Sequence, residues 1–442
     1  MSKIEANRIG FSFLEIIISV GFLIIITQAF LSLISTSFHF LGLSRTQSSA
    51  RALANQQLEL IRNIPYSDVG TISGIPIGTI PQTQYRQLNG QDYTINTSIV
   101  YIDDPFDNKA PTDLLPVDYK RVRVKVTWNG PFSSQDGITL ITDIVPKGIE
   151  SMTGGGTLGI LVFDADGIPI PQAQVHITAP TLSPPIDLSL DTDNNGNLIL
   201  PGAPICTTCY KITVSKEGYS TDQTYSTSEV TNPIMPYQTI LENQITQISF
   251  SIDHTANLTI KTYNYPSLTE KGSTNLLIKG DKTIGTDTDG NPVYKFSHTI
   301  NTNNQGHASI DLEWDNYTIT STEDFLFAGS NPISPITLIP EQFETISIAF
   351  HSPVNFSLLN LVKDASGSAI PNVTNKISKS SGYEATTSTG LENDMNFGFS
   401  WFTLPESGIY TLELSHPQYE TATTSVSINS NEIQSYILNK IN

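Results

Sequence analysis

The pattern of hydrophobic positions divides the chain into an apolar N-terminal stretch and a body of short alternating segments. Residues 11–43 are apolar almost throughout, and only a few small or polar residues interrupt the stretch. Such a run is long enough to cross a bilayer as a helix. Between residues 44 and 64 the apolar side chains recur every three or four positions, which predicts one apolar face. Because Pro65 cannot continue a helix, we expect one helix over residues 11–64, with a membrane half and an amphipathic half.

After Pro65 the pattern becomes that of β-strands. Asn89-Gly90 is a strong signal for a tight hairpin turn. From Tyr119 to Trp128 the residues alternate, with valines on one face and basic side chains on the other. These segments predict a small antiparallel sheet, packed on the amphipathic half of the helix, within residues 65–150.

The remaining sequence contains an internal repeat. Residues 161–177 align with residues 361–377, and the segment from Tyr210 aligns with the segment from Tyr410. A more divergent copy lies halfway between them, and each copy closes with a similar strand. Repeats of this length fit whole domains, and short alternating strands separated by Gly, Pro, Asp and Asn indicate β-sandwiches. The expected boundaries are 153–253, 254–351 and 352–442.

Together these patterns predict a mixed fold class, α+β followed by all-β. A long N-terminal transmembrane and amphipathic helix carries a small antiparallel-sheet head, and three β-sandwich domains follow. The net charge of −19 over 442 residues argues against nucleic acid as a partner, because phosphate binding needs a basic face. With two cysteines in so long a chain, the domains should fold on hydrophobic cores rather than on a disulfide framework.

The start of the apolar stretch carries a specific motif. A short basic leader ends in Gly10, which is followed directly by Phe11 and a little further on by Glu15. This arrangement resembles the processing site of type IV prepilins and of type II secretion pseudopilins. The resemblance implies a leader over residues 1–10, cleavage after Gly10 by a prepilin peptidase of the membrane, and methylation of the new N-terminal Phe11. It also implies other pilin subunits as partners through the N-terminal helix.

Glu15 stands inside the apolar run, where an isolated carboxylate costs about 3 kcal/mol at the bilayer centre and less near a helix end. Cleavage after Gly10 would free a positive amine on Phe11. The Phe11 amine of a neighbouring subunit is then a partner for Glu15, and the pair would offset the cost of the charge and fix the axial register of assembly. The alternative is a glutamate whose carboxylate reaches the lipid headgroups.

Each expected sandwich resembles the carboxypeptidase regulatory-like, transthyretin-like group. In the first unit the resemblance rests on Asp164, Gly167, Ile170 and Pro171, followed by an Asn-Gly turn and by the strand from Tyr210. It implies modules without catalytic activity. Neither HExxH nor GxSxG occurs in the sequence, so we expect no enzyme, although the paired carboxylates of a glycosidase need not be close in the chain.

Two acidic segments are candidates for calcium, because Ca²⁺ prefers oxygen ligands. The first carries five aspartates without a fixed ligand spacing: Asp103, Asp104, Asp107, Asp113 and Asp118. The second runs from Asp191 to Asn197 and mimics half an EF-hand loop, but Gly202 takes the place of the closing glutamate. We therefore expect a solvated loop and a hairpin turn, with calcium as the alternative and no other metal or cofactor.

Two further motifs concern the sandwiches. Cys206 and Cys209 are spaced for a local disulfide, which is the expected state on an extracellular face. A redox pair and half of a zinc site are the alternatives. Phe397, Phe399 and Trp401 lie on one face of an expected strand, and an inward core face is favoured over an exposed ligand platform.

These features predict a minor or tip subunit of a type IV pilus-like surface filament. The chain would cross the cytoplasmic membrane once before assembly and then lie at the cell surface, where its sandwiches adhere to an extracellular ligand. Three sandwiches are difficult to repeat along a packed fibre, which is why a minor subunit is expected. The alternatives are a pseudopilin of a type II secretion-like system and a membrane-anchored surface binding protein that does not polymerise. Glu15 discriminates between these, because a plain anchor has no use for it.

Overall fold

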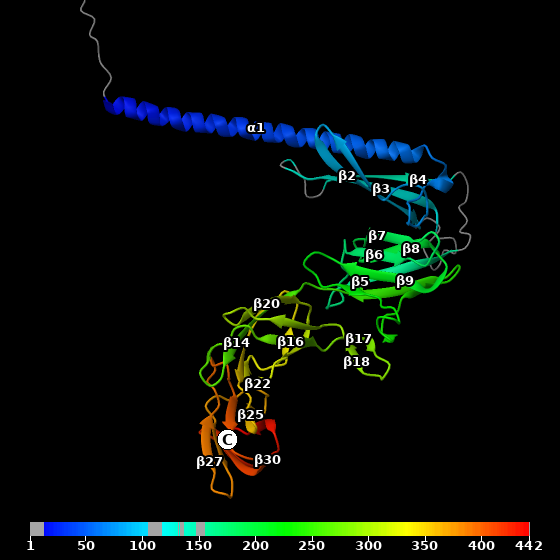
Figure 1. Ribbon diagram of the computed structural model, residues 1–442. Coiled ribbons are helices and arrows are strands. Elements are labelled where there is room, and N and C mark those ends of the chain that lie inside the picture. Colours follow the sequence, from blue (N-terminus) through cyan, green and yellow to red (C-terminus); the bar gives the residue numbers. More distant parts are fainter. Residues whose placement is uncertain (1–12, 105–116, 131, 133–136, 147–154, 442) are drawn as a thin grey trace, which may run out of the picture.

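The structure is a computed structural model that describes residues 13–104, 117–130, 132, 137–146 and 155–441. It is elongated and curved (Figure 1). A long helix lies at one end, a small β-sheet head packs on the second half of this helix, and three further β units follow in a row to the C-terminus. The fold class predicted from the sequence is confirmed.

The helix, α1 (Phe13–Arg62), is 50 residues long and unbroken. It ends three residues before Pro65, where the side chain and backbone of Asn63 both bond to the carbonyl oxygen of Glu59. Five apolar side chains at helical spacing form a buried stripe along its second half: Ala50, Leu53, Ala54, Leu58 and Ile61. This stripe is the apolar face that the sequence predicted.

The head consists of four antiparallel strands in chain order: β1 (Thr83–Leu88), β2 (Gln91–Ile102), β3 (Tyr119–Trp128) and β4 (Ile138–Ile144). Asn89 and Gly90 join β1 to β2 with φ values of 53° and 77°, as a two-residue hairpin turn requires. The three alternating valines of β3 are fully buried and share one core with the stripe of α1. The hairpin and the alternating strand are therefore confirmed.

Sandwich 1 (residues 155–251) has two sheets, ordered β13-β5-β8 and β10-β9-β6-β7, with β12 also paired to β9. Its strands are β5 (Gly155–Phe163), β6 (Gln174–Ala179), β7 (Ile186–Asp191), β8 (Asn197–Pro204), β9 (Cys206–Ser215), β10 (Asp222–Gln223), β11 (Asn232–Pro233), β12 (Gln238–Ile240) and β13 (Ile245–Ser251). Alternate residues of both sheets point inward and form one apolar core.

Sandwich 2 (residues 256–351) has the sheets β15-β14-β24-β22, with β20 also on β14, and β19-β16-β21-β23. Its strands are β14 (Ala256–Asn264), β15 (Thr269–Glu270), β16 (Asn275–Gly280), β17 (Thr283–Thr286), β18 (Pro292–Tyr294), β19 (Ser297–Asn301), β20 (His307–Leu312), β21 (Asp315–Ser321), β22 (Leu326–Asn331), β23 (Ile336–Leu338) and β24 (Phe343–His351). It also buries an apolar core of its own.

Sandwich 3 (residues 357–441) has the sheets β28-β25-β31 and β27-β26-β29-β30. Its strands are β25 (Ser357–Asp364), β26 (Thr374–Ser378), β27 (Glu384–Ser388), β28 (Phe399–Thr403), β29 (Gly408–His416), β30 (Tyr419–Ile428) and β31 (Asn431–Leu438). The aligned segments of the repeat form equivalent strands, β5 with β25 and β9 with β29.

One tyrosine occupies the same place in the core of each sandwich, including the divergent second copy. Tyr210, Tyr317 and Tyr410 are fully buried. Their hydroxyls donate to the carbonyl oxygens of Pro204, Glu313 and Glu406 at 2.7, 2.9 and 2.8 Å. Burial raises the pKa of Tyr210 and Tyr317 far above the usual tyrosine value, because an ionised phenolate would lose its hydration.

The segment that mimics an EF-hand loop is a turn, but not a hairpin. Oδ1 of Asp193 accepts hydrogen bonds from the backbone amides of Asn195 and Asn197, both at 2.8 Å. The turn leads from β7 to β8, which belong to different sheets, so it crosses the sandwich. The Asn-Gly signal specifies the tight turn, but it does not specify which sheet the next strand joins, and the expected hairpin is wrong.

Neighbouring parts of the row are joined by different contacts. The amide of Gln82 in the head donates to the carbonyl oxygen of Asp187 in sandwich 1 at 2.6 Å. Between sandwiches 1 and 2, β11 pairs with β17, so that the β17–β18 hairpin extends from sandwich 2 onto sandwich 1.

Between sandwiches 2 and 3, an apolar cluster includes Ala328, Ala349, Leu359, Phe399 and Trp401. Phe399 and Trp401 are buried against sandwich 2, and the core cluster of sandwich 3 does not contain them. Neither the expected core face nor the alternative ligand platform describes this position, because the strand face is covered by a neighbouring domain.

Candidate functional site

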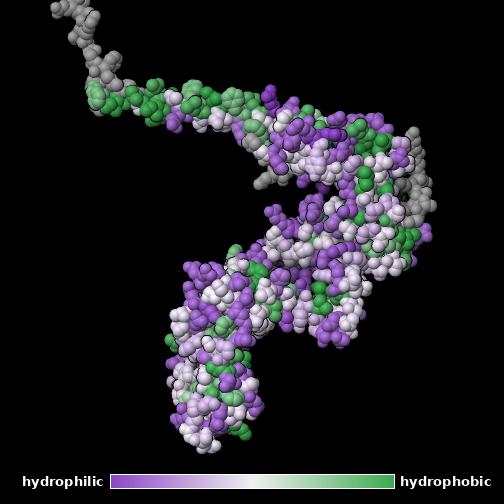
Figure 2. Space-filling model, viewed as in Figure 1, coloured by the Kyte–Doolittle hydropathy of each residue, from purple (hydrophilic) through white to green (hydrophobic). Residues whose placement is uncertain are grey.

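The first part of α1 presents exposed apolar side chains to its surroundings, and near its end the ring of His39 contacts Phe132 of the head. Residues 22–41 are all exposed. In Figure 2 this part of the helix carries an almost continuous apolar surface, whereas the rest of the molecule is largely polar. By length and composition this helix is able to cross a membrane. We call residues 13–41 the exposed half of α1 and residues 42–62 its packed half.

Three hydroxyl groups in the exposed half are satisfied inside the helix. The side chains of Thr27, Thr36 and Ser37 donate to the carbonyl oxygens four residues earlier, at 2.7, 2.8 and 2.8 Å. A hydroxyl that is already bonded costs little in an apolar environment. These polar residues are therefore compatible with a surrounding of lipid or of other apolar helices.

The boundary between the two halves is a contact with the head. A Cβ atom on Gly42 would lie 2.5 Å from the ring of Phe132. The carbonyl oxygen of Phe132 accepts hydrogen bonds from the Trp128 indole at 2.6 Å and from the Thr46 hydroxyl at 3.3 Å. Its ring also lies 5.4 Å from the ring of His39. The absence of a side chain at Gly42 thus allows the head to dock on the helix at this point.

The predicted processing residues fall at the edge of the described part of the chain. Gly10 and Phe11 lie outside the described residues. The backbone of Glu15 belongs to the first turn of α1, at the far end of the exposed half from the head. Processing between Gly10 and Phe11, and an assembly role for Glu15, therefore stay predictions.

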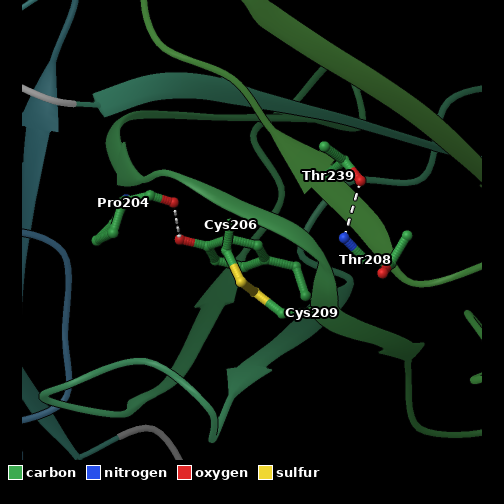
Figure 3. Close-up of a disulfide and its surroundings, with 6 residues drawn as sticks. Pro204, Cys206, Thr208, Cys209 and Thr239 are labelled. Atoms are coloured by element: carbon green, nitrogen blue, oxygen red, sulfur yellow. Dashed lines mark hydrogen bonds between the residues drawn. A yellow bond between two sulfur atoms is a disulfide. The ribbon is translucent and has the colours of Figure 1, made fainter.

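Cys206 and Cys209 are joined by a disulfide at the start of β9 (Figure 3). The bridge closes a tight turn whose backbone amide at Thr208 donates to the hydroxyl of Thr239 at 2.8 Å. Cys206 also pairs with Ile240 of β12, and Cys209 is buried in the core of sandwich 1. Sulfurs bonded to each other are not thiolate ligands, so this arrangement favours a staple of β9 over a zinc site.

The first acidic segment is only partly described, since Asp107 and Asp113 lie outside the described residues. At its base, the amide of Asp104 donates to the carboxylate of Asp118 at 2.7 Å, which closes the segment between β2 and β3. Within the described part of the chain, no group of three His, Cys, Asp or Glu side chains is placed to hold a metal ion. The alternative of calcium in this loop stays untested.

A cluster of charges, not predicted from the sequence, lies between sandwiches 1 and 2. The ammonium of Lys295 lies 2.8 Å from Glu313 and 3.5 Å from Asp222 of sandwich 1. Desolvation lowers the pKa of Lys295, but the nearby carboxylates outweigh it and the pKa is raised. Desolvation lowers the pKa of Lys282, whose ammonium also contacts Glu313 at 3.0 Å. No local motif marks these residues, because they come from separate segments of sandwich 2 and, for Asp222, from sandwich 1.

On the face of the head that lies opposite α1 and faces sandwich 1, Arg121 donates two hydrogen bonds to the carboxylate of Asp143, at 2.7 and 2.8 Å. These bonds hold the pKa of Asp143 below its usual value. The pair crosses from β3 to β4 at directly opposed positions. It therefore helps to fix the edge strand of the head to its neighbour.

Comparisons with known proteins give distant structural likenesses. No family model matches the chain, and no curated protein matches it. The Bacillus anthracis TIE protein is similar at 15% identity and a TM-score of 0.19, over 81% of this chain and 73% of that one. The Streptococcal ancillary pilin is similar at 11% identity and a TM-score of 0.19, over 65% of this chain and 99% of that one.

BcpA, the major pilin subunit of Bacillus cereus, is similar at 11% identity and a TM-score of 0.17, over 65% of this chain and 99% of that one. Similarities at these scores do not assign a function to this chain. Its function is therefore inferred from its own residues and geometry.

Proposed function

We propose that this protein is a minor or tip subunit of a type IV pilus-like surface filament, inserted and assembled through α1. The observation that carries the proposal is the division of one helix into an exposed apolar half and a half packed on a head. A helix that is apolar and exposed over residues 22–41 needs lipid or other helices around it. A prepilin peptidase and other pilin subunits are the partners this function requires.

The motif at the start of the helix supports assembly over simple anchoring. An anchor gains nothing from a carboxylate in its apolar segment, since the charge only weakens insertion. In a filament, Glu15 would pair with the processed amine at Phe11 of a neighbouring subunit. Glu15 belongs to the first turn of a continuous helix, and a pair at this position would fix the axial stagger of subunits.

The sandwiches supply reach and recognition in this proposal, and we assign them no catalytic step. They follow one another away from the head, and the C-terminus lies at the end of the row (Figure 1). Their polar surface is suited to an extracellular position. Adhesion to an extracellular ligand would therefore take place at a distance from the membrane.

A truncation tests this division of labour. The core that the head shares with α1 is separate from the sandwich cores, although Ile75 of the head is buried in the core of sandwich 1. A chain ending at residue 149 exposes Ile75 but keeps the core of α1 and the head, so it should still insert and enter filaments. It should lose attachment to whatever surface the filament recognises. If substrate export fails instead of attachment, the secretion pseudopilin is the correct function. Failure of the truncated chain to insert and assemble would show that residues 1–149 are not a self-sufficient pilin.

A further inference from the structure

We propose that the three sandwiches are built to bear tension along the chain. In each of them the first and the last strand are neighbours in one sheet and run parallel. β5 pairs with β13 from Thr157↔Ile245 to Phe163↔Ser251, β14 with β24 from Asn257↔Phe343 to Asn264↔Phe350, and β25 with β31 from Ser357↔Asn431 to Asp364↔Leu438. The use of this strength in a cell rests on the proposed surface filament, but the strength itself does not.

Parallel pairing determines how a pulling force reaches the ladder of hydrogen bonds. The chain enters each sandwich at the beginning of its first strand and leaves it at the end of its last strand. Because the two strands are parallel, these points lie at opposite ends of the paired segment. Tension then slides one strand along the other and loads all the slanted inter-strand bonds of the ladder together. If both points lay at one end, the bonds would open one after another.

The connections between sandwiches pass the force directly from one ladder to the next. Only residues 252–255 separate β13 from β14, and only residues 352–356 separate β24 from β25. Each ladder also has one face in an apolar core. Ile160 and Phe250 bury their side chains beneath the ladder of sandwich 1, and Ile260 and Ile346 do so in sandwich 2. Exclusion of water from this face strengthens the ladder bonds.

The head does not share this design. Its first element is α1, and its last strand, β4, is an edge strand that pairs antiparallel with β3 alone. Its described residues therefore contain no ladder that joins a first strand to a last strand. A parallel ladder between the first and the last strand thus occurs in all three sandwiches and distinguishes them from the head.

Single-molecule pulling on the full chain in detergent micelles tests the proposal. One handle is attached at Val145→Cys, which is 68% exposed and follows β4, and the other at Lys440→Cys, which is exposed and follows β31. Cys206 and Cys209 are bonded to each other and do not take handles. Three separate unfolding events are expected, each releasing roughly 30 nm of chain at about 3.5 Å per residue.

The matched control moves only the second handle. Ser430 is exposed and lies in the turn before β31, beside the start of β25, because Asn431 pairs with Ser357. With the handle at Ser430→Cys, the force opens the ladder of sandwich 3 from one end, while sandwiches 1 and 2 are still sheared. The event of sandwich 3 should fall to roughly half its force or less, because forced unfolding follows the unfolding barrier in the pulling direction. The other two events should not change.

Equal forces for sandwich 3 with the handle at Lys440 and at Ser430 would overturn the proposal. Sandwich 2 gives an independent comparison between handles at Ser352→Cys and Glu341→Cys, which follow and precede β24, should the Ser430 variant not fold. A negative result would leave the filament proposal intact, because insertion, processing and assembly are measured without force. Conversely, a chain that never enters filaments would still show the difference between handle positions.

Discussion

The exposed half and the packed half of α1 belong to one unbroken helix, yet their side chains lie in different surroundings. In the packed half, apolar residues alternate with polar ones at helical spacing, and the apolar stripe is buried on the head. In the exposed half, apolar residues occur on all sides, and residues 22–41 touch nothing that buries them. An amphipathic stripe has a single partner face, whereas a helix that is apolar all round needs partners on every side. The comparison therefore separates what this chain supplies for itself from what it must obtain by insertion and assembly.

The largest effect is expected from removing the one charge of the exposed half. Glu15→Ala should leave membrane insertion intact or improve it, because a carboxylate no longer enters the bilayer. Incorporation into filaments should be lost, since the proposed partner of the Phe11 amine is gone. The measurement is the amount of protein in sheared filaments relative to the amount in the membrane. Glu59→Ala is the matched control, because Glu59 lies exposed on the packed half in an ion pair with Arg62, and such pairs contribute little. Equal recovery of both variants in filaments would remove the assembly role of Glu15.

The next effect concerns the packed half. Ile61 is 1% exposed in the core shared by α1 and the head, so Ile61→Ala should destabilise the head by about 2–4 kcal/mol. Leu60→Ala, at a neighbouring residue that is 58% exposed, should change stability by roughly 0.5 kcal/mol or less. Hydrogen exchange of the amides of β2 and β3, measured on the full chain in micelles, reports the difference. Similar exchange in the two variants would show that α1 is not part of the head's core.

A smaller effect separates two glycines of the same helix. A Cβ on Gly42 would meet the Phe132 ring, so Gly42→Ala should displace that ring and cost about 1–3 kcal/mol. A Cβ on Gly21 meets nothing within 4 Å, so in micelles Gly21→Ala should stabilise the helix by up to about 1 kcal/mol. Thermal unfolding of the head and loss of the contact between Phe132 and His39 in NMR spectra test the pair. A Gly42→Ala variant as stable as the parent would contradict the docking boundary.

The smallest effect is a pH dependence on the far side of the head from α1. The folded pKa of Asp143 is lowered by Arg121, so the stabilisation is fully present above the unfolded pKa of about 3.9. It is lost as the pH falls through the folded pKa. Asp143→Asn should therefore flatten the loss of head stability below about pH 4, measured by denaturant titration. Salt should reduce the effect, since both side chains are partly exposed. If the stability of the head falls below about pH 4 in the variant as it does in the parent, the pair does not contribute to the acid sensitivity of the head.

Local patterns predicted the helix, the head and the repeated strands because each of these depends on neighbours in sequence. No information from elsewhere in the chain is needed to predict the Asn-Gly turn between β1 and β2, the alternating valines of β3 or the apolar stripe of α1. Other features depend on contacts between distant segments. These are the sheet that the strand after β7 joins, the burial of Trp401 against sandwich 2, and the pairing of Lys295 with Asp222. Trp401 illustrates the limit most clearly, because an alternating strand shows that one face is apolar but does not show which domain covers it.

The candidate site divides in the same way. The run of apolar residues fixes the length of the exposed half, and the motif around Gly10, Phe11 and Glu15 predicts processing and pairing that involve a peptidase and other subunits. Neither event is a contact within one chain. The β17–β18 hairpin carries an Asp-Gly turn signal of its own, so its presence was readable, but its pairing with β11 was not. The account of assembly therefore needs experimental evidence from outside the chain, whereas the fold follows from contacts within it.

The most direct test of assembly through α1 is the mass of the N-terminal peptide of protein recovered from surface filaments. Cells with an active prepilin peptidase should yield a chain that begins at Phe11 and carries one methyl group on its amine. Such a chain would place a processed amine and Glu15 in the same filament, as assembly through the exposed half of α1 requires. Filament protein that still begins at Met1, or a chain found only in the membrane and never in filaments, would contradict the claim that α1 is an assembly helix.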